Sequence, residues 1–151
     1  MTDLYVDADA CPVREEVYRV AERLNLKVFV VSNGSRPIRP SPNPNIQMIV
    51  VGAKLDEADD WIAERITAKD VCVTSDIPLA QRCLAKGARA LSFNGKPWTA
   101  NNIGSAMAGR AISQHLRELG QTTGGPPSFS KADRSRFLSA LDTMVHAALR
   151  A

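Results

Sequence analysis

Short apolar runs alternate with amphipathic stretches along the first two thirds of the chain. Five runs have the length and the β-branched content of buried strands: about 3–7, 27–32, 46–51, 71–74 and 88–93. Apolar residues recur at helical spacing in five other stretches: about 12–24, 55–68, 77–86, 101–119 and from Ser130 onward. Alternation of strand and helix is typical of an α/β fold, and it predicts a mainly parallel sheet.

The first strand runs directly into two acidic residues, Asp7 and Asp9, and a helix pattern begins at Pro12. The carboxyl ends of parallel strands form the edge at which open α/β sheets place their ligands. Two carboxylates there repel each other, which a divalent cation, a proton or a basic partner would relieve. The alternative for Asp9 is to cap the next helix, whereas Asp7 lies too far before Pro12 to do so.

A second junction of this kind follows the run Val71-Cys72-Val73-Thr74. There the chain continues as Ser75-Asp76-Ile77-Pro78 into a helix pattern. Asp76 before a proline in the first turn is a good N-cap. Capping and metal binding are compatible, so Asp76 stays a candidate ligand.

A third carboxylate, Asp59, comes from the predicted helix over 55–68. It lies on the same side of that helix as the apolar Ile62 and Ile66. A carboxylate that faces the core is costly unless it meets a charge or an ion. The alternative is that Asp59 lies at the edge of the stripe and pairs with a nearby Lys or Arg.

The residues after the second strand leave the same edge of the sheet. Ser32 ends that strand, and residues 33–45 carry four prolines together with Arg36 and Arg39. Ser32 and the two arginines are therefore candidates for contact with an anionic substrate. The composition of this loop equally suits an inert surface loop.

The last helix begins with a second candidate anion site. Ser130 and Asp133 have the spacing of a capping box, with Asp in place of Glu. Arg134 and the free backbone amides of this first turn could hold a phosphate. The preceding Gly-Gly-Pro-Pro run lacks the spacing of a Walker phosphate loop.

Length and composition predict one domain over residues 1–151, with the helical segment from about 100 to 151 packed on it. Three cysteines without a CxxC pair favour a reducing, cytoplasmic location. No apolar run is long enough to cross a bilayer, and the start of the chain does not have the pattern of a signal peptide. The oligomeric state stays open, with a homodimer as one option.

The charge is distributed unevenly along the chain. Residues 1–76 carry nine Lys/Arg and thirteen Asp/Glu, and residues 77–151 carry ten and three. A basic surface beside an acidic pocket suits a polyanionic partner such as RNA or DNA. A solvated surface of uneven charge is the alternative.

Three segments resemble those of the bacterial YaiI/YqxD family: residues 6–12 (VDADACP), 73–80 (VTSDIPLA) and 124–134 (GGPPSFSKADR). That family is grouped with PIN-like domains, so the resemblance implies a three-layer α/β/α sandwich. It also implies a metal-dependent nuclease, acting on RNA rather than DNA, whose acids come from the first strand, a middle helix and the fourth strand. Asp7, Asp59 and Asp76 occupy those three positions.

The resemblance suggests a mechanism. Asp7, Asp59 and Asp76 would bind Mg2+ or Mn2+, and Asp9 would bind through water or act as the general base. Thr74 and Ser75 would orient ligands or waters. Active PIN nucleases carry a further acid after the next strand, where this chain has Ser92, Asn94 and Asn101. The expectation is therefore one metal rather than two.

Two other functions remain open. One is a non-catalytic RNA-binding or adaptor protein, which the missing acid and the basic second half favour. The other is a phosphatase of the haloacid-dehalogenase type, with Asp7 as nucleophile, Asp9 as acid/base, Ser32 as the second motif and Lys54 or Lys69 as the lysine. Asp59 has no role in that second mechanism.

Overall fold

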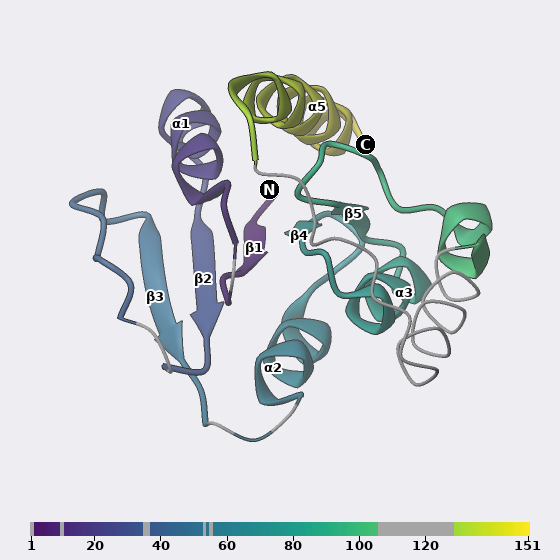
Figure 1. The fold of residues 1–151 in the computed structure, drawn as a ribbon, viewed down its shortest axis with the longest axis horizontal. Coiled ribbons are helices and arrows are strands. Elements are labelled where there is room, and N and C mark those ends of the chain that lie inside the picture. Colours follow the sequence, from purple (N-terminus) through teal and green to yellow (C-terminus); the bar gives the residue numbers. More distant parts are fainter. Residues whose placement is uncertain (1, 10, 35–36, 53, 55, 106–128) are drawn as a thin grey trace, which may run out of the picture.

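A five-stranded sheet runs through the centre of the molecule (Figure 1). The computed structural model describes residues 2–9, 11–34, 37–52, 54, 56–105 and 129–151. The strands are β1 (Leu4–Asp7), β2 (Val28–Ser32), β3 (Ile46–Val50), β4 (Val71–Val73) and β5 (Arg89–Leu91). All neighbouring strands are parallel, in the order β3-β2-β1-β4-β5. The predicted parallel α/β architecture is confirmed.

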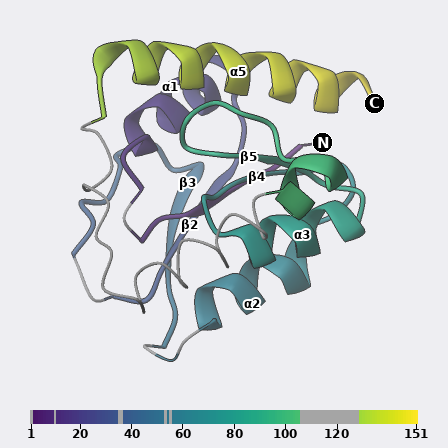
Figure 2. The same ribbon diagram turned by 45° about the vertical axis from the view of Figure 1, so that its right-hand side comes forward.

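Helices cover both faces of the sheet. They are α1 (Arg14–Leu24), α2 (Glu57–Arg65), α3 (Ile77–Ala85) and α5 (Lys131–Arg150). α1 and α5 lie side by side over one face, and α2 and α3 lie over the other (Figures 1 and 2). The three-layer α/β/α arrangement is therefore confirmed. No helix in the described part of the chain combines the length and the hydropathy that a membrane crossing requires.

The alternation of side chains along β1 divides the core into two clusters. Leu4 and Val6 are buried against the α1/α5 layer, and Tyr5 packs with the α2/α3 layer. Burial of a Val, Leu or Phe side chain stabilises the fold by about 1.5–3 kcal/mol, so each layer holds the sheet firmly. Because successive strand residues point to opposite faces, Asp7 lies on the α2/α3 side, at the end of the strand.

The chain changes direction across the sheet at β1. From β1 it builds outward through β2 and β3, and then crosses back to place β4 and β5 on the other side of β1. The crevice at the carboxyl ends of β1 and β4 is thus the topological switch point, where open α/β sheets bind their ligands. Asp7 ends one of these strands, and Thr74 follows the other.

Some boundaries differ from the sequence prediction. α2 is shorter than 55–68 because Asp56 adopts a left-handed conformation before it and Ile66 is extended after it. β5 ends at Leu91 because residues 92–96 form a turn, in which the amide of Ser92 donates to the carbonyl of Lys96. Of the helix expected over 101–119, the described part is helical over 100–105, and residues 106–119 lie outside the described residues.

Candidate acidic active site

A cavity of about 450 Å³ opens at the switch point. Its walls come from the ends of β1 and β4, the start of α2 and the connections that leave β2, β3 and β5. The lining residues are Asp7, Asp9, Asn33, Lys54, Asp56, Ala58, Asp59, Ser75, Asp76 and Phe93. The structure therefore brings all four sequence-predicted acids to one cavity, together with Asp56.

Thr74 connects the two strand-end acids. Its side chain is fully buried, and its hydroxyl donates to Oδ2 of Asp7 at 2.9 Å. The same hydroxyl oxygen accepts the backbone N–H of Asp76, also at 2.9 Å. The indole Nε1 of Trp98 donates to the Thr74 carbonyl oxygen at 3.0 Å. Thr74 thus fixes the Asp7 carboxylate and the start of α3 relative to each other.

Asp76 also caps α3, as the sequence predicted. Its Oδ1 accepts the backbone N–H of Leu79 at 2.9 Å. Asp9 does not cap α1, whose N-cap residue is Val13 without a side-chain hydrogen bond. Instead the Asp9 carboxylate accepts the backbone N–H of Asn33, with N···O distances of 3.2 and 3.4 Å, and this ties it to the end of β2. Both carboxylates are held, and both reach the cavity.

Asp59 has little support from hydrogen bonds. No described residue donates a hydrogen bond to it, and the neighbouring Arg82 pairs with Asp60 at 2.6 Å instead. Burial raises the pKa of Asp59 to about 7, and the negative charges of Asp76 and Asp7 add to this rise. Arg82 therefore does not provide the ion pair that the sequence offered as an alternative for Asp59. Asp59 is a half-buried acid that lies among other acids.

The pKa of Asp7 is also raised, but less than that of Asp59. Burial raises its pKa to about 6, the Thr74 hydrogen bond works in the opposite direction, and the charges of Asp76 and Asp9 raise it further. Two carboxyl groups that titrate near neutral pH within one cavity are typical of functional sites. Their mutual repulsion would fall if a cation entered the cavity.

Asp56 adds a conformational feature to this cavity. Its φ of 72° is in the left-handed region, which costs a non-glycine residue on the order of 1 kcal/mol. Its side chain makes no capping hydrogen bond to α2, and it lines the cavity. Backbone strain of this kind is concentrated at functional sites.

The donor chemistry of the cavity suits a hard divalent cation. Carboxylate oxygens are the ligands that Mg2+ and Mn2+ prefer, and no described histidine or cysteine lines the cavity. Within the described residues, however, no three carboxylate, imidazole or thiol groups stand close enough together to hold an ion as they lie. The residue types of the cavity therefore suit a divalent cation, but the acids line a common cavity and do not surround a single position for an ion.

The other predicted site residues are distributed over the molecule. Ser75 lines the cavity, while Ser32 is buried at the end of β2 and does not line it. Arg36 lies outside the described residues. Arg39 lines a separate hollow beside α1. The structure thus brings neither Ser32 nor Arg39 to the acidic cavity.

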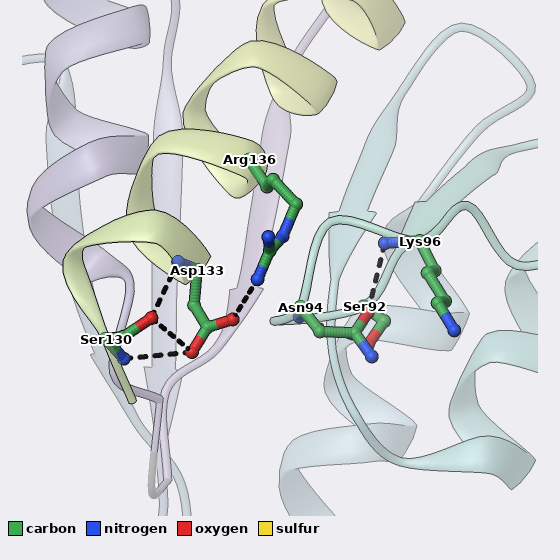
Figure 3. Close-up of polar contacts among 6 residues, drawn as sticks. All are labelled: Ser92, Asn94, Lys96, Ser130, Asp133 and Arg136. Carbon is green, nitrogen blue, oxygen red and sulfur yellow. Dashed lines mark hydrogen bonds and ion pairs between the residues drawn. The ribbon is translucent and has the colours of Figure 1, made fainter. Parts of the chain in front are cut away.

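Arg134 is committed to a contact between helices. Its Nη1 donates to the carbonyl oxygen of Pro12 at 2.7 Å and to Oε1 of Glu16 at 3.2 Å. The first turn of α5 is also satisfied internally, because Ser130 and Asp133 form the predicted capping box (Figure 3). Arg134 therefore joins α5 to α1 and does not line the acidic cavity.

The turn after β5 holds Ser92 and Asn94, which stand where the resemblance to PIN-like nucleases implies a further acid. Oδ1 of Asn94 accepts the backbone N–H of Lys96 at 3.0 Å, so this side chain stabilises the turn (Figure 3). Neither Ser92 nor Asn94 lines the cavity. Phe93, between them, does line it.

Sequence reasoning missed Asn33 as part of this wall, and it named Lys54 only as a candidate lysine of the phosphatase alternative. Both follow strands, β2 and β3, whose carboxyl ends lie on the same edge as those of β1 and β4. The rule that identified Asp7 and Asp76 could have identified them too, since connections that leave this edge face its crevice.

The fold and the cavity together define an α/β protein with a parallel sheet of switch-point topology and an acidic site at that switch point. The model of the family described as "Uncharacterized BCR, YaiI/YqxD family" matches residues 5–147. The chain belongs to this family, and the predicted resemblance is confirmed.

Curated relatives match the chain from end to end. A UPF0178 protein of Paramagnetospirillum magneticum is 57% identical over 150 residues, which cover 99% of this chain and 98% of the relative. A UPF0178 protein of Caulobacter sp. strain K31 is 56% identical with the same coverage. One of Rhodospirillum centenum is 52% identical over 99% of both chains. No solved structure matches the chain.

Proposed function

We propose that this protein is a metal-dependent nuclease that hydrolyses phosphodiester bonds, with RNA preferred over DNA as substrate. The observation that carries the proposal is the convergence of Asp7, Asp9, Asp59 and Asp76 on one cavity at the switch point. Stability alone does not favour such a cluster, since burial and the negative charges of its members raise the pKa values of Asp7 and Asp59. Binding of a cation and a substrate would account for this cluster of acids.

Asp7, Asp59 and Asp76 are the residues that would hold the ion. When bound, Mg2+ or Mn2+ would acidify water and offset negative charge on the phosphodiester. Thr74 holds Asp7 in place through its 2.9 Å hydrogen bond, and the Leu79 amide holds Oδ1 of Asp76. These contacts fix two of the three ligands before any ion arrives.

Asp9 is the residue we assign as general base. The Asn33 amide fixes its carboxylate at the cavity wall. It would take a proton from the attacking water, a role that requires an ionised carboxylate within hydrogen-bonding reach of that water. Ser75 at the same wall would orient water or substrate through its hydroxyl group.

A polyanionic substrate needs some positive charge near so many acids. Among the described residues that line the cavity, Lys54 is the cation placed to contact a phosphate there. The basic second half of the sequence supplies longer-range attraction. Sequence-independent contacts of this kind make binding strongly dependent on salt concentration.

The test combines calorimetry with cleavage. Mg2+ and Mn2+ are titrated into the wild type, Asp7→Asn, Asp76→Asn and the control Asp60→Asn, while labelled single-stranded RNA is incubated with each. Asp60 is an exposed acid on α2 that pairs with Arg82, so its loss changes total charge without changing the cavity. We expect the wild type and Asp60→Asn to bind metal and cleave RNA. In the two cavity variants we expect both the metal affinity and the cleavage rate to fall by about 100-fold or more.

Two other results would replace the proposal. RNA binding that survives loss of Asp7 and Asp76, without cleavage, would identify a binding protein with a degenerate site. Turnover of p-nitrophenyl phosphate without RNA cleavage would identify a phosphatase. One observation favours that phosphatase reading, namely that Lys54 lies at the same cavity as Asp7 and Asp9. The helix acid Asp59 favours the nuclease.

A further inference from the structure

A second cavity, of about 500 Å³, lies away from the acidic site, between β5, the end of α3 and α5. Its walls are almost entirely apolar. Trp98 and Leu84 contribute large surfaces, and Ala90 of β5 and Ala140 of α5 contribute small ones. This volume is within the range of about 300–1,000 Å³ that is typical of small-molecule sites.

α5 contributes apolar side chains both to the core and to this cavity. Phe137, Leu141 and Val145 of this helix are fully buried in the core. Ala140 and Met144 lie beside that stripe, where they pack against the edge of the core and also line the cavity. Alanines on both walls leave a gap that larger side chains would have filled.

Trp98 makes one wall rigid. Its backbone N–H donates to the carbonyl oxygen of Ala90 at 2.9 Å, and its indole Nε1 donates to that of Thr74 at 3.0 Å. With both groups satisfied, the ring has no polar atom left to present to the cavity. A fixed aromatic wall lowers the entropy cost of binding an apolar ligand.

Arg89 is the one charged residue among those described that line this cavity. It begins β5, and its side chain is partly buried. Its guanidinium forms no hydrogen bond, ion pair or ring contact with any other described residue, in contrast to Arg82 and Arg134. An arginine that lines an apolar cavity, and to which no described residue offers a carboxylate, is complementary to a ligand that supplies one.

We propose that this cavity binds a small apolar molecule that carries a single carboxylate. The apolar part lies against Trp98, Met144 and the alanines, and the carboxylate pairs with the Arg89 guanidinium. Each Å² of apolar surface removed from water contributes roughly 25 cal/mol, and the two-pronged ion pair fixes the orientation of the ligand. The acidic cavity would repel the same ligand, so the two sites select opposite charges.

The experiment compares three probes of equal chain length, namely decanoate, decan-1-ol and decyltrimethylammonium, each titrated below its aggregation concentration. Binding is followed by calorimetry and by the fluorescence of Trp98 in a Trp61→Phe background. Arg89→Gln removes the charge, and Ala140→Leu fills the cavity. Arg150→Gln, on the exposed end of α5, is the matched control for loss of one positive charge.

We expect saturable binding of decanoate, about tenfold tighter than that of decan-1-ol, with the cationic probe weakest. Arg89→Gln should remove the preference for decanoate, and Ala140→Leu should weaken both decanoate and decan-1-ol at least tenfold. Arg150→Gln should bind as the wild type does. Equal affinity for decanoate and decan-1-ol, an Arg89→Gln variant that keeps the preference, or no saturation in the wild type would each overturn the proposal. If Ala140→Leu does not fold, the probe series and Arg89→Gln still decide.

Discussion

The two ends of β1 and β4 carry acidic groups that differ in how their charges are satisfied. At the amino end, Asp70 is only 4% exposed, and its carboxylate accepts three hydrogen bonds. These come from the backbone N–H of Asp3 at 3.0 Å, the backbone N–H of Thr67 at 2.8 Å and the Thr67 hydroxyl at 2.9 Å. At the carboxyl end, Asp7 accepts one hydrogen bond from the described residues and Asp59 accepts none.

This difference separates a structural acid from a candidate functional one. Burial does not explain this difference, because Asp70, which has the most hydrogen bonds, is also more deeply buried than Asp7 or Asp59. The number of hydrogen-bond donors around each carboxylate explains the difference. A carboxylate surrounded by N–H and O–H groups stabilises the fold, whereas one surrounded by other carboxylates destabilises it. Asp7 and Asp59 are therefore tolerated by the fold rather than required by it, whereas Asp76 also caps α3.

Removing the structural acid should have the largest effect. Asp70→Ala leaves the amides of Asp3 and Thr67 without their acceptor, so we expect a loss of about 3 kcal/mol in the free energy of unfolding. The melting temperature should then fall by roughly 10 °C, measured by circular dichroism. Metal affinity of the folded variant should stay unchanged. A loss below about 1 kcal/mol would show that the three hydrogen bonds do not brace this end of the sheet.

Removing the Thr74 hydroxyl, which joins Asp7 to the start of α3, should have an intermediate effect. Thr74→Val deprives the Asp76 amide of its acceptor and Asp7 of its donor, so we expect a loss of about 2 kcal/mol. Thr74→Ser keeps the hydroxyl and is the matched control, with a loss below about 1 kcal/mol. Chemical denaturation measures both. Equal losses in the two variants would mean that the hydroxyl contributes no more than the methyl group does, which would contradict the role given to its two hydrogen bonds.

Neutralising the unsupported acid should stabilise the protein by a smaller amount. The folded-state pKa of Asp59, about 7, lies above its ordinary value of 3.8, so folding takes up a proton between those pH values. The contribution of Asp59 to stability therefore falls as the pH rises through this window. Without metal, Asp59→Asn should gain about 1 kcal/mol at pH 8, after allowance for its partial exposure, and nothing below about pH 4.

Asp60→Asn, one residue along α2, is the control for that prediction. Asp60 is exposed and paired with Arg82, so its neutralisation should change stability by less than about 0.5 kcal/mol. Thermal melts at pH 4, 6 and 8 in EDTA compare the two variants. A gain in Asp59→Asn that does not depend on pH would contradict the proposed repulsion.

Local patterns were sufficient to predict the strand-end acids and the sheet that carries them. An apolar run that ends in Asp, followed by a helix pattern, fixes both the strand and the edge at which Asp7 and Asp76 lie. Asp59 followed from the helical phase of Ile62 and Ile66, which are both fully buried. These inferences need only the periodicity of a single element.

Contacts between distant segments were beyond reach of the sequence. Arg134 looked free to bind phosphate, but it meets Glu16, which lies 118 residues earlier in the chain. Nothing in a charge pattern tells which carboxylate an arginine will find after folding. The same limit applied to the apolar cavity, whose walls come from α3, β5 and α5.

The central place of β1 has a consequence for how the chain folds as it is synthesised. Leu4 pairs with Val28 on one side and with Val71 on the other, and Asp7 and Thr74 lie 67 residues apart. At roughly 5–20 residues per second, the second partner of β1 leaves the ribosome several seconds after the first. During that interval β1 has an open edge, which is a template for wrong pairing. The acids of the switch point therefore come together only when β4 closes that edge, so every nascent chain completes its site late.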